Sequence, residues 1–216
     1  MSSKHNKPDY SDIVEYESGG DRAHHHRGKS SEDLVDKIAI VANLGIRSGQ
    51  IVLDAGCGNG YITKEFLKLV GAGGRVFALD VDEIAIAELR RESAGTSLEA
   101  LVADISRETP LTESSFDLVY LATVFHGFSA DQVRGFEREV CRILKPGGRL
   151  AIVEIVKRVT PFGPPLPMRY SPEELQQALN LLPLATVGVG EYFYLQLFEN
   201  RVTGLTGSAP AASGLV

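Results

Sequence analysis

Residues 51–60, Ile51-Val-Leu-Asp-Ala-Gly-Cys-Gly-Asn-Gly60, decide the fold. Three apolar residues lead into an acidic one, and glycines then alternate with other residues. The positions of one helical face are apolar in the segment that follows: Tyr61, Ile62, Phe66, Leu67 and Val70. This pattern predicts a buried parallel strand, a tight turn and the start of a helix. Glycines there allow a positive φ and let a ligand approach the backbone, and free amides at a helix start favour a negative or polar group.

The spacing of these glycines excludes two phosphate-binding motifs. The dinucleotide fingerprint Gly-x-Gly-x-x-Gly/Ala would place Tyr61 or Thr63 at its last position, and neither fits. The pattern Gly-x-x-x-x-Gly-Lys-Ser/Thr of a P-loop is absent. What remains is Asp-x-Gly-x-Gly-x-Gly, with its acid at Asp54. A carboxylate at the open mouth of this loop, where Asp54 is predicted to lie, would repel phosphate and attract a cationic amine.

The stretch from Val52 to Gly60 resembles the first motif of the S-adenosylmethionine (SAM)-dependent methyltransferases with a Rossmann-like fold. The alternative is a strand, turn and helix whose glycines serve packing alone. The resemblance implies a three-layer α/β fold with a seven-stranded, mostly parallel sheet that ends in an antiparallel hairpin. It also implies SAM as cofactor and S-adenosylhomocysteine (SAH) as product.

Acids also follow the next two predicted strands. Asp80 ends the strand predicted over residues 75–80, where an acid can accept hydrogen bonds from both ribose hydroxyls. Asp104 follows the strand predicted over 98–102, and by itself it could be only a turn former. In the resembled family the acid at this position accepts the adenine amino group, and the next amide contacts the ring. The cofactor-binding set that the resemblance implies is Asp54, Ala55, Gly56, Cys57, Gly58, Gly60, Asp80, Val81, Asp104, Ile105 and Leu121.

Thr123-Val-Phe-His-Gly-Phe128 follows the strand predicted over residues 115–122. It resembles the corresponding segment of the quinone-biosynthesis C-methyltransferases and their relatives, which commonly carry one or more histidines here. Imidazole titrates near neutral pH, so His126 is the candidate general base if the acceptor must lose a proton. Alternatively, His126 packs near the cofactor or hydrogen-bonds to a backbone group. The Asn-Pro-Pro-Tyr signature of many methylases of base amino groups is absent, which disfavours base N-methylation.

The rest of the chain predicts one methyltransferase domain over residues 30–200, with a flexible arm or lid over 1–29 and a disordered tail over 201–216. A first helix is predicted to start at a Ser30 cap and to end at Gly45. Its apolar stripe comprises Leu34, Val35, Ile38, Val41 and Leu44. Further elements are predicted as helices over 60–70, 83–93 and 130–144, a turn over 145–148, a strand over 149–156, a helix from Ser171, and a hairpin over 184–198.

The segment 157–170 contains four prolines, which prevent regular structure. Because it follows a strand on the ligand side of the sheet, its apolar side chains could wall a substrate pocket. These are Phe162, Leu166, Met168 and Tyr170. A stiff connector is the alternative interpretation.

Composition bounds the function further. Lys+Arg 22 against Asp+Glu 28 gives a net charge of -6, which disfavours an enzyme of nucleic acids. The two cysteines, Cys57 and Cys141, are too few for arsenic methylation and need no disulfide. The adjacent side chains of His24–His26 do not converge well on one ion, so no metal site is predicted. Neither a signal peptide nor a membrane-spanning run is evident, which predicts a cytoplasmic protein.

The predicted function is transfer of a methyl group from SAM to a small-molecule acceptor by in-line displacement. Whether the acceptor atom is carbon, oxygen or nitrogen stays open. One alternative is a protein that binds SAM or SAH without catalysis. Another is a protein or RNA methyltransferase, which should show a basic or extended docking surface. The expected partner is a small molecule, with no nucleic acid or membrane, and the expected state is a monomer or homodimer.

Overall fold

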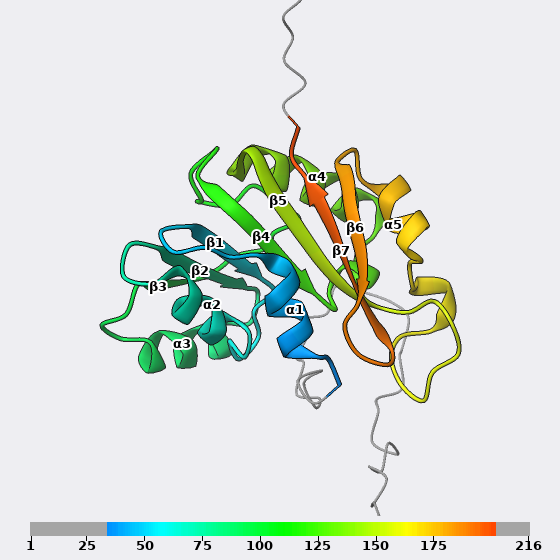
Figure 1. Ribbon diagram of the computed structural model, residues 1–216, viewed down its shortest axis with the longest axis horizontal. Helices are drawn as coiled ribbons and strands as arrows, with labels where there is room; N and C mark the ends of the chain where they lie inside the picture. Colours follow the sequence, from blue (N-terminus) through cyan, green and yellow to red (C-terminus); the bar gives the residue numbers. More distant parts are fainter. Residues whose placement is uncertain (1–33, 202–216) are drawn as a thin grey trace, which may run out of the picture.

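The computed structural model describes residues 34–201 (Figure 1). The predicted arm, the Ser30 cap and the His24–His26 run lie outside the described residues, as does the predicted tail beyond Arg201.

A seven-stranded sheet with the order β3-β2-β1-β4-β5-β7-β6 forms the middle layer. The strands are β1 (Ile51–Ala55), β2 (Arg75–Asp80), β3 (Leu98–Val102), β4 (Phe116–Ala122), β5 (Leu144–Ile155), β6 (Leu182–Gly188) and β7 (Phe193–Glu199). β1 to β5 pair in parallel, whereas β7 is antiparallel to both of its neighbours, β5 and β6. This topology confirms the predicted α/β fold with its antiparallel terminal hairpin.

Helices cover both faces of the sheet (Figure 1). They are α1 (Lys37–Leu44), α2 (Thr63–Val70), α3 (Glu83–Glu92), α4 (Ala130–Ile143) and α5 (Pro172–Ala178), with short 3₁₀ turns η2 (Phe125–Gly127) and η3 (Leu166–Met168). Residues of α1 and α2 pack with Val52 and Val76, and those of α3 pack with Ala78. Residues of α4 and α5 pack with Leu53 and Val119, whose side chains point to the opposite face. The two apolar layers confirm the predicted three-layer arrangement.

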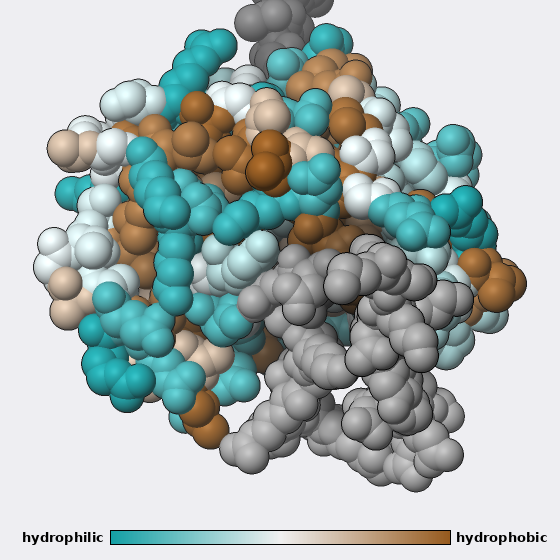
Figure 2. Space-filling model, turned by 60° about the horizontal axis from the view of Figure 1, so that its bottom comes forward, coloured by the Kyte–Doolittle hydropathy of each residue, from teal (hydrophilic) through white to brown (hydrophobic). Residues whose placement is uncertain are grey.

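The direction of the strand order reverses between β1 and β4. At such a switch point the loops after the two strands part to opposite faces and leave a crevice at the carboxyl edge of the sheet, where open α/β sheets bind ligands. This edge lies on the lower side of the molecule in Figure 1 and faces forward in Figure 2. It is the edge that carries the predicted site residues.

The first helix begins later than predicted. Its N-cap is Asp36, whose carboxylate accepts a hydrogen bond from the Ala39 amide at 2.9 Å. Gly45 ends it in a left-handed conformation, as predicted. The assignment of Ile38 to the apolar stripe was wrong, because its side chain is 80% exposed. With the helix starting at Lys37, the side chains that face the sheet are four residues apart, at Ile40 and Leu44.

The turn predicted over residues 145–148 is part of β5. Leu144 lies opposite Phe116, and the next paired residue is Arg149, so the intervening residues form an irregularity in the ladder. Asn200 holds this segment, because its carbonyl accepts from the Gly147 amide at 2.9 Å and its own amide donates to the Gly148 carbonyl at 2.8 Å. A long-range contact therefore extends the strand through a sequence that is locally typical of a turn.

Candidate active site

The glycine loop that follows β1 places three glycines at positive φ: 70° at Gly56, 51° at Gly58 and 75° at Gly60. A Cβ at Gly56 would lie 2.7 Å from Val124 Cγ2, and one at Gly60 would lie 2.6 Å from Leu89 Cδ1. A Cβ at Gly58 would meet nothing within 4 Å. Gly56 and Gly60 are therefore needed for close packing, whereas Gly58 faces open space that a ligand can enter.

The amides of this loop are less free than the sequence predicted. Gly56 and Cys57 both donate to the Leu79 carbonyl, at 2.6 and 3.1 Å. The Gly58 amide donates to Asp80 Oδ2 at 2.8 Å. These bonds tie the loop to the end of β2, so its contribution to a ligand site is shape and space more than unpaired donors.

Cys57 fills a packing position. Its side chain is buried with Ile86 and Leu89 of α3. Burial raises the pKa of the Cys57 thiol, and the nearby Asp54 and Asp80 raise it further. The thiol therefore stays protonated, and only the backbone of Cys57 is left to meet a ligand.

Asp80 retains acceptor capacity at the tip of β2. Its Oδ2 accepts from the Gly58 amide, and its Oδ1 accepts from the Asp82 amide at 2.9 Å. Because each oxygen of an ionised carboxylate has about two lone pairs, each can accept one more hydrogen bond. Two acceptors side by side suit a pair of neighbouring hydroxyls. The adjacent Val81 side chain is 52% exposed and offers apolar surface.

Asp104 is a turn former in this structure. Its Oδ1 accepts from the amide and hydroxyl of Ser106, at 2.8 and 2.7 Å. Its Oδ2 lies 3.4 Å from Nε of the exposed Arg107. The side chain of Ile105 is buried in the core, and its amide has no hydrogen-bond partner in the part of the chain that the structure describes. That amide is a free donor between Asp104 and Ser106.

Asp54 lies beneath the glycine loop, where it is 2% exposed, and not at an open mouth. It accepts a hydrogen bond from the Thr63 hydroxyl at 2.5 Å. Burial raises the pKa of Asp54 to about 7, the hydrogen bond from Thr63 opposes this rise, and the negative charge of Asp80 adds to it. Asp54 is therefore partly protonated near neutral pH in the ligand-free protein.

The raised pKa of Asp54 predicts a pH-dependent stability. Between about pH 4 and 7 the folded protein holds a proton that the unfolded chain releases, so the free energy of unfolding falls as pH rises. Asp54 should contribute a slope of about 1.4 kcal/mol per pH unit in this window. Urea denaturation at pH 5, 6 and 7 measures it, and Asp54→Asn should lack this slope. Identical pH profiles for both proteins would contradict the burial of a titrating Asp54.

His126 lies in η2, directly after β4. Thr123, the residue after the strand, has a φ of 55°, which is strained for a β-branched side chain. This turn packs Val124 against Gly56 and brings His126 to Glu154. His126 Nδ1 lies 2.8 Å from Glu154 Oε2, and the His126 amide donates to Oε1 at 3.2 Å. Both carboxylate oxygens of Glu154 thus bond to the same residue, His126.

Aromatic rings fix the backbone around His126. The ring of Phe125 packs edge to face on Tyr170 at 5.0 Å, on Phe128 at 5.7 Å and on Phe136 at 5.8 Å between centroids. The His126 side chain itself is 14% exposed. The imidazole is therefore held in one place with a small part of its surface open.

Comparison with known proteins shows which family this geometry represents. Residues 52–148 match the family model described as a methyltransferase domain. The chain contains a class I SAM-dependent methyltransferase domain. The matched residues begin in β1 and end near the start of β5, so they include the glycine loop, β2, β3 and β4.

Curated and solved relatives agree with this family. The ubiquinone/menaquinone biosynthesis C-methyltransferase UbiE of Laribacter hongkongensis is 33% identical over 127 residues, which are 57% of this chain and 50% of the relative. An uncharacterized methyltransferase of Synechocystis is 32% identical over 65% of this chain and 64% of its own length. A SAM-dependent methyltransferase of Aquifex aeolicus has a TM-score of 0.70 and 27% identity, over 80% of this chain and 93% of that one. The chain spans about half the length of the UbiE relatives it matches.

The methyltransferase domain presents groups that fit SAM or SAH. The open space at Gly58 admits a ligand chain, and Asp80 has acceptors for two hydroxyls. The Ile105 amide can donate a hydrogen bond to a ring nitrogen, and the exposed Val81 side chain offers apolar surface to the face of the same ring. Of the other predicted residues, Ala55 and Leu121 are buried neighbours in the β1–β4 ladder, so their backbones define the floor. In Figure 2 hydrophobic residues are exposed between hydrophilic ones on this face of the domain.

Glu154 is a candidate site residue of the methyltransferase domain that sequence reasoning missed. It is fully buried, and among residues 34–201 the hydrogen bonds of its carboxylate go to His126 alone. Burying a carboxylate is costly unless it is paired, so a buried acid aimed at one imidazole makes the two side chains a candidate functional pair. One signal was available: Glu154 is the single charged residue within the apolar run from Leu150 to Val156.

The proline-rich loop divides between the two interpretations offered for it. Phe162 is a core residue, because its ring packs on Tyr192 at 5.2 Å and on Phe193 at 6.2 Å. Tyr170 packs on Phe125 and so lies beside the His126 segment. The stiffness of the loop comes in part from a buried residue that the sequence did not indicate: Arg169 donates to the carbonyls of Val156, Arg158, Phe162 and Pro164 and to the Thr160 hydroxyl.

The part of the chain that the structure describes holds no group of three or more His, Cys, Asp or Glu side chains able to bind a metal ion. No helix within residues 34–201 is long and apolar enough to cross a membrane.

Proposed function

We propose that the chain transfers the methyl group of SAM to a small-molecule acceptor whose reacting group carries a removable proton. The observation that carries this proposal is the buried His126–Glu154 pair, joined at 2.8 Å and linked through Val124 to the glycine loop. A methyltransferase whose acceptor attacks without losing a proton needs no such base. A histidine that only packed would not need a fully buried carboxylate behind it.

The residues act in a defined order. Asp80 and the Ile105 amide hold the adenosyl portion, and Asp54 ionises as a cationic amine approaches. When bound, SAM supplies a methyl group whose bond to sulfur breaks with both electrons going to sulfur, so that neutral SAH leaves. The electron pair of the acceptor forms the new bond to that methyl carbon. Positioning of the two reactants can supply up to about 7–11 kcal/mol of the acceleration.

His126 takes the proton. With its Nδ1–H donated to Glu154, its Nε2 keeps a lone pair directed away from that carboxylate. Nε2 accepts the acceptor proton as the new bond forms, and Glu154 stabilises the resulting imidazolium. The names of the UbiE relatives, which are C-methyltransferases, support a carbon acceptor, and a hydroxyl would use the same base.

Methyl-labelled SAM incubated with a metabolite extract tests this function. The proposal expects label in a product of low molecular mass, with one SAH formed per methyl group transferred. Tight SAH binding with no label transfer from any fraction would favour a binding protein. Label found only in protein or RNA fractions would contradict a small-molecule acceptor.

Glu154→Gln should lower kcat while SAM binding stays unchanged. The amide keeps the size of the side chain but no longer stabilises an imidazolium. We expect a loss of about 10- to 100-fold, a part of the roughly 10²–10⁴ that positioned proton transfer contributes. Steady-state kinetics measures kcat, and thermal melts with and without SAM measure folding and SAM binding. The exposed Glu174→Gln is the matched control. An unchanged kcat in a folded Glu154→Gln protein would remove Glu154 from the proton transfer.

A further inference from the structure

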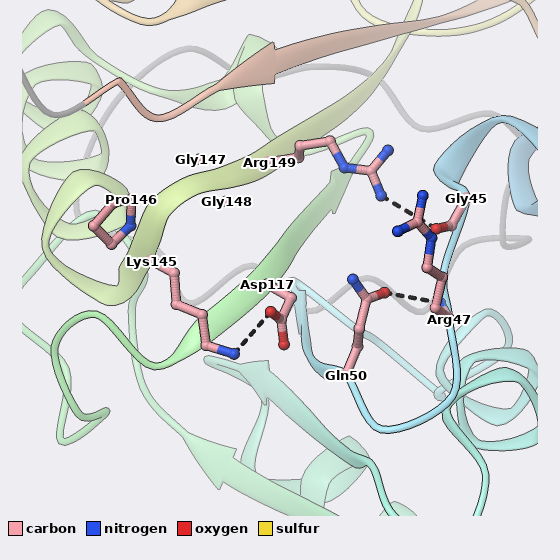
Figure 3. A pocket seen from close by; sticks show the side chains of 9 residues that line it. All are labelled: Gly45, Arg47, Gln50, Asp117, Lys145, Pro146, Gly147, Gly148 and Arg149. Atoms are coloured by element: carbon pink, nitrogen blue, oxygen red, sulfur yellow. Dashed lines mark hydrogen bonds and ion pairs between the residues drawn. The ribbon is translucent and has the colours of Figure 1, made fainter.

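A cavity lies at the opposite edge of the sheet from the glycine loop. Its volume is about 420 Å³, and it opens between the segment after α1 and the start of β5 (Figure 3). Its lining comes from Gly45, Arg47, Gln50, Asp117, Lys145, Pro146, Gly147, Gly148 and Arg149. Gln50 precedes β1 and Asp117 is near the start of β4, whereas the SAM site lies at the far ends of these two strands. The proposed methyl transfer uses no residue of this cavity.

The charges that line the cavity do not balance. Three are positive, on Arg47, Lys145 and Arg149, and one is negative, on Asp117. Asp117 Oδ1 accepts from Lys145 Nζ at 2.7 Å, and Oδ2 accepts from the Ile51 amide at 2.8 Å. The single carboxylate is thus committed to Lys145 and to the backbone. The two arginines remain without a counter-charge from the lining.

The two guanidinium groups lie on the same side of the cavity and approach each other (Figure 3). Arg149 Nη2 donates to the carbonyls of Leu44 and Gly45, at 2.6 and 3.3 Å, which caps the end of α1. The guanidinium of Arg47 has no hydrogen-bond partner among the described residues. Burial lowers the pKa of Arg149, and the positive charge of Arg47 lowers it further. Two cations held together in this way favour an anion between them.

We propose that this cavity binds the phosphate group of a small phosphorylated molecule between Arg47 and Arg149. The planar guanidinium matches phosphate oxygens with two parallel hydrogen bonds, which an ammonium cannot do. The net charge of the lining, three positive and one negative, suits a phosphate dianion. A volume of about 420 Å³ exceeds that of a bare phosphate and falls in the range of small-molecule sites. Gly147, where a Cβ would meet nothing within 4 Å, leaves room for the rest of the ester.

Calorimetric titration with inorganic phosphate and with ribose 5-phosphate, at ionic strength matched with sodium chloride, tests the proposal. Arg47→Gln is the informative variant, because Arg149 also holds α1. We expect one saturable site for ribose 5-phosphate, tighter than that for inorganic phosphate. We expect Arg47→Gln to weaken both at least tenfold and to leave SAH affinity within twofold. Arg91→Gln, an exposed arginine of α3, is the control and should change neither.

Three results would overturn the proposal. One is the absence of saturable binding of ribose 5-phosphate to the unmodified chain. Another is an equal loss of affinity in Arg47→Gln and Arg91→Gln, which would show a response to overall charge. The third is binding of inorganic phosphate as tight as that of the ester, which would assign the cavity to free phosphate. Since SAH binding is measured in the same samples, a failure here is distinct from a failure of the methyltransferase site.

Discussion

His126→Ala should lower turnover with the true acceptor by about 10²- to 10⁴-fold, the typical contribution of a positioned general base. SAM affinity should stay within about twofold, because His126 hydrogen-bonds to Glu154 and not to the acids that suit the adenosyl group. Without a base the reaction depends on the acceptor losing its proton to water. The activity of the variant should therefore rise at high pH, where the acceptor ionises by itself.

A control separates this loss from damage to the η2 segment. Phe128→Leu removes a ring contact of Phe125 next to His126 but leaves the imidazole and Glu154 in place. It should keep most of the activity. Turnover of His126→Ala equal to that of the unmodified chain, with the same acceptor and pH, would remove the base role and leave His126 as a packing residue.

Asp80→Ala should weaken SAM and SAH binding by about two to four orders of magnitude. Two hydrogen bonds to a charged acceptor are worth roughly 1.5–3 kcal/mol each, and the substitution removes both. It also releases the Gly58 and Asp82 amides, which loosens the glycine loop. Asp80→Asn keeps one carbonyl acceptor and should bind with intermediate affinity.

Calorimetry with SAH measures this series directly. Asp131→Asn, an exposed acid at the start of α4, changes the charge by the same amount away from the site and should bind SAH normally. An SAH affinity within twofold of the unmodified value in Asp80→Ala would show that the ribose is held elsewhere.

The parts of the fold that local spacing controls could be predicted from the sequence. The strand, glycine loop and helix over residues 51–70 depend on neighbouring residues, since each glycine has a conformation that its position requires. Asp80 and Asp104 could be placed for the same reason, because one ends and the other follows a strand whose apolar pattern is visible. The capping box at Ser171 is equally local.

Features that depend on distant contacts could not be predicted in this way. Glu154 and His126 are 28 residues apart, and only the pairing of β4 with β5 brings them together. Arg169 turns back on a loop whose carbonyls it binds, a geometry without a sequence signature. Asp54 was predicted at an open mouth, but the loop folds over it and buries it. The apolar pattern of β1 contains no information on which segment covers the carboxyl end of that strand.

The identity of the methyl acceptor also could not be predicted from the sequence. In the proposed site the residues of the cofactor half follow the ends of β1, β2 and β3, so that half could be predicted from the strand order. The acceptor half depends on loops that the fold leaves free to vary, here η2 and the proline-rich segment up to Tyr170. The proposed base limits the chemistry of the acceptor but not its shape.

A crystal structure of the chain with bound SAH would show whether Asp80 and His126 lie on either side of one cofactor. We expect the ribose hydroxyls on the Asp80 carboxylate, the adenine at the Ile105 amide, and the sulfur on the side of the glycine loop that faces His126. SAH bound with its sulfur turned away from His126, or bound without contact to Asp80, would contradict this expectation.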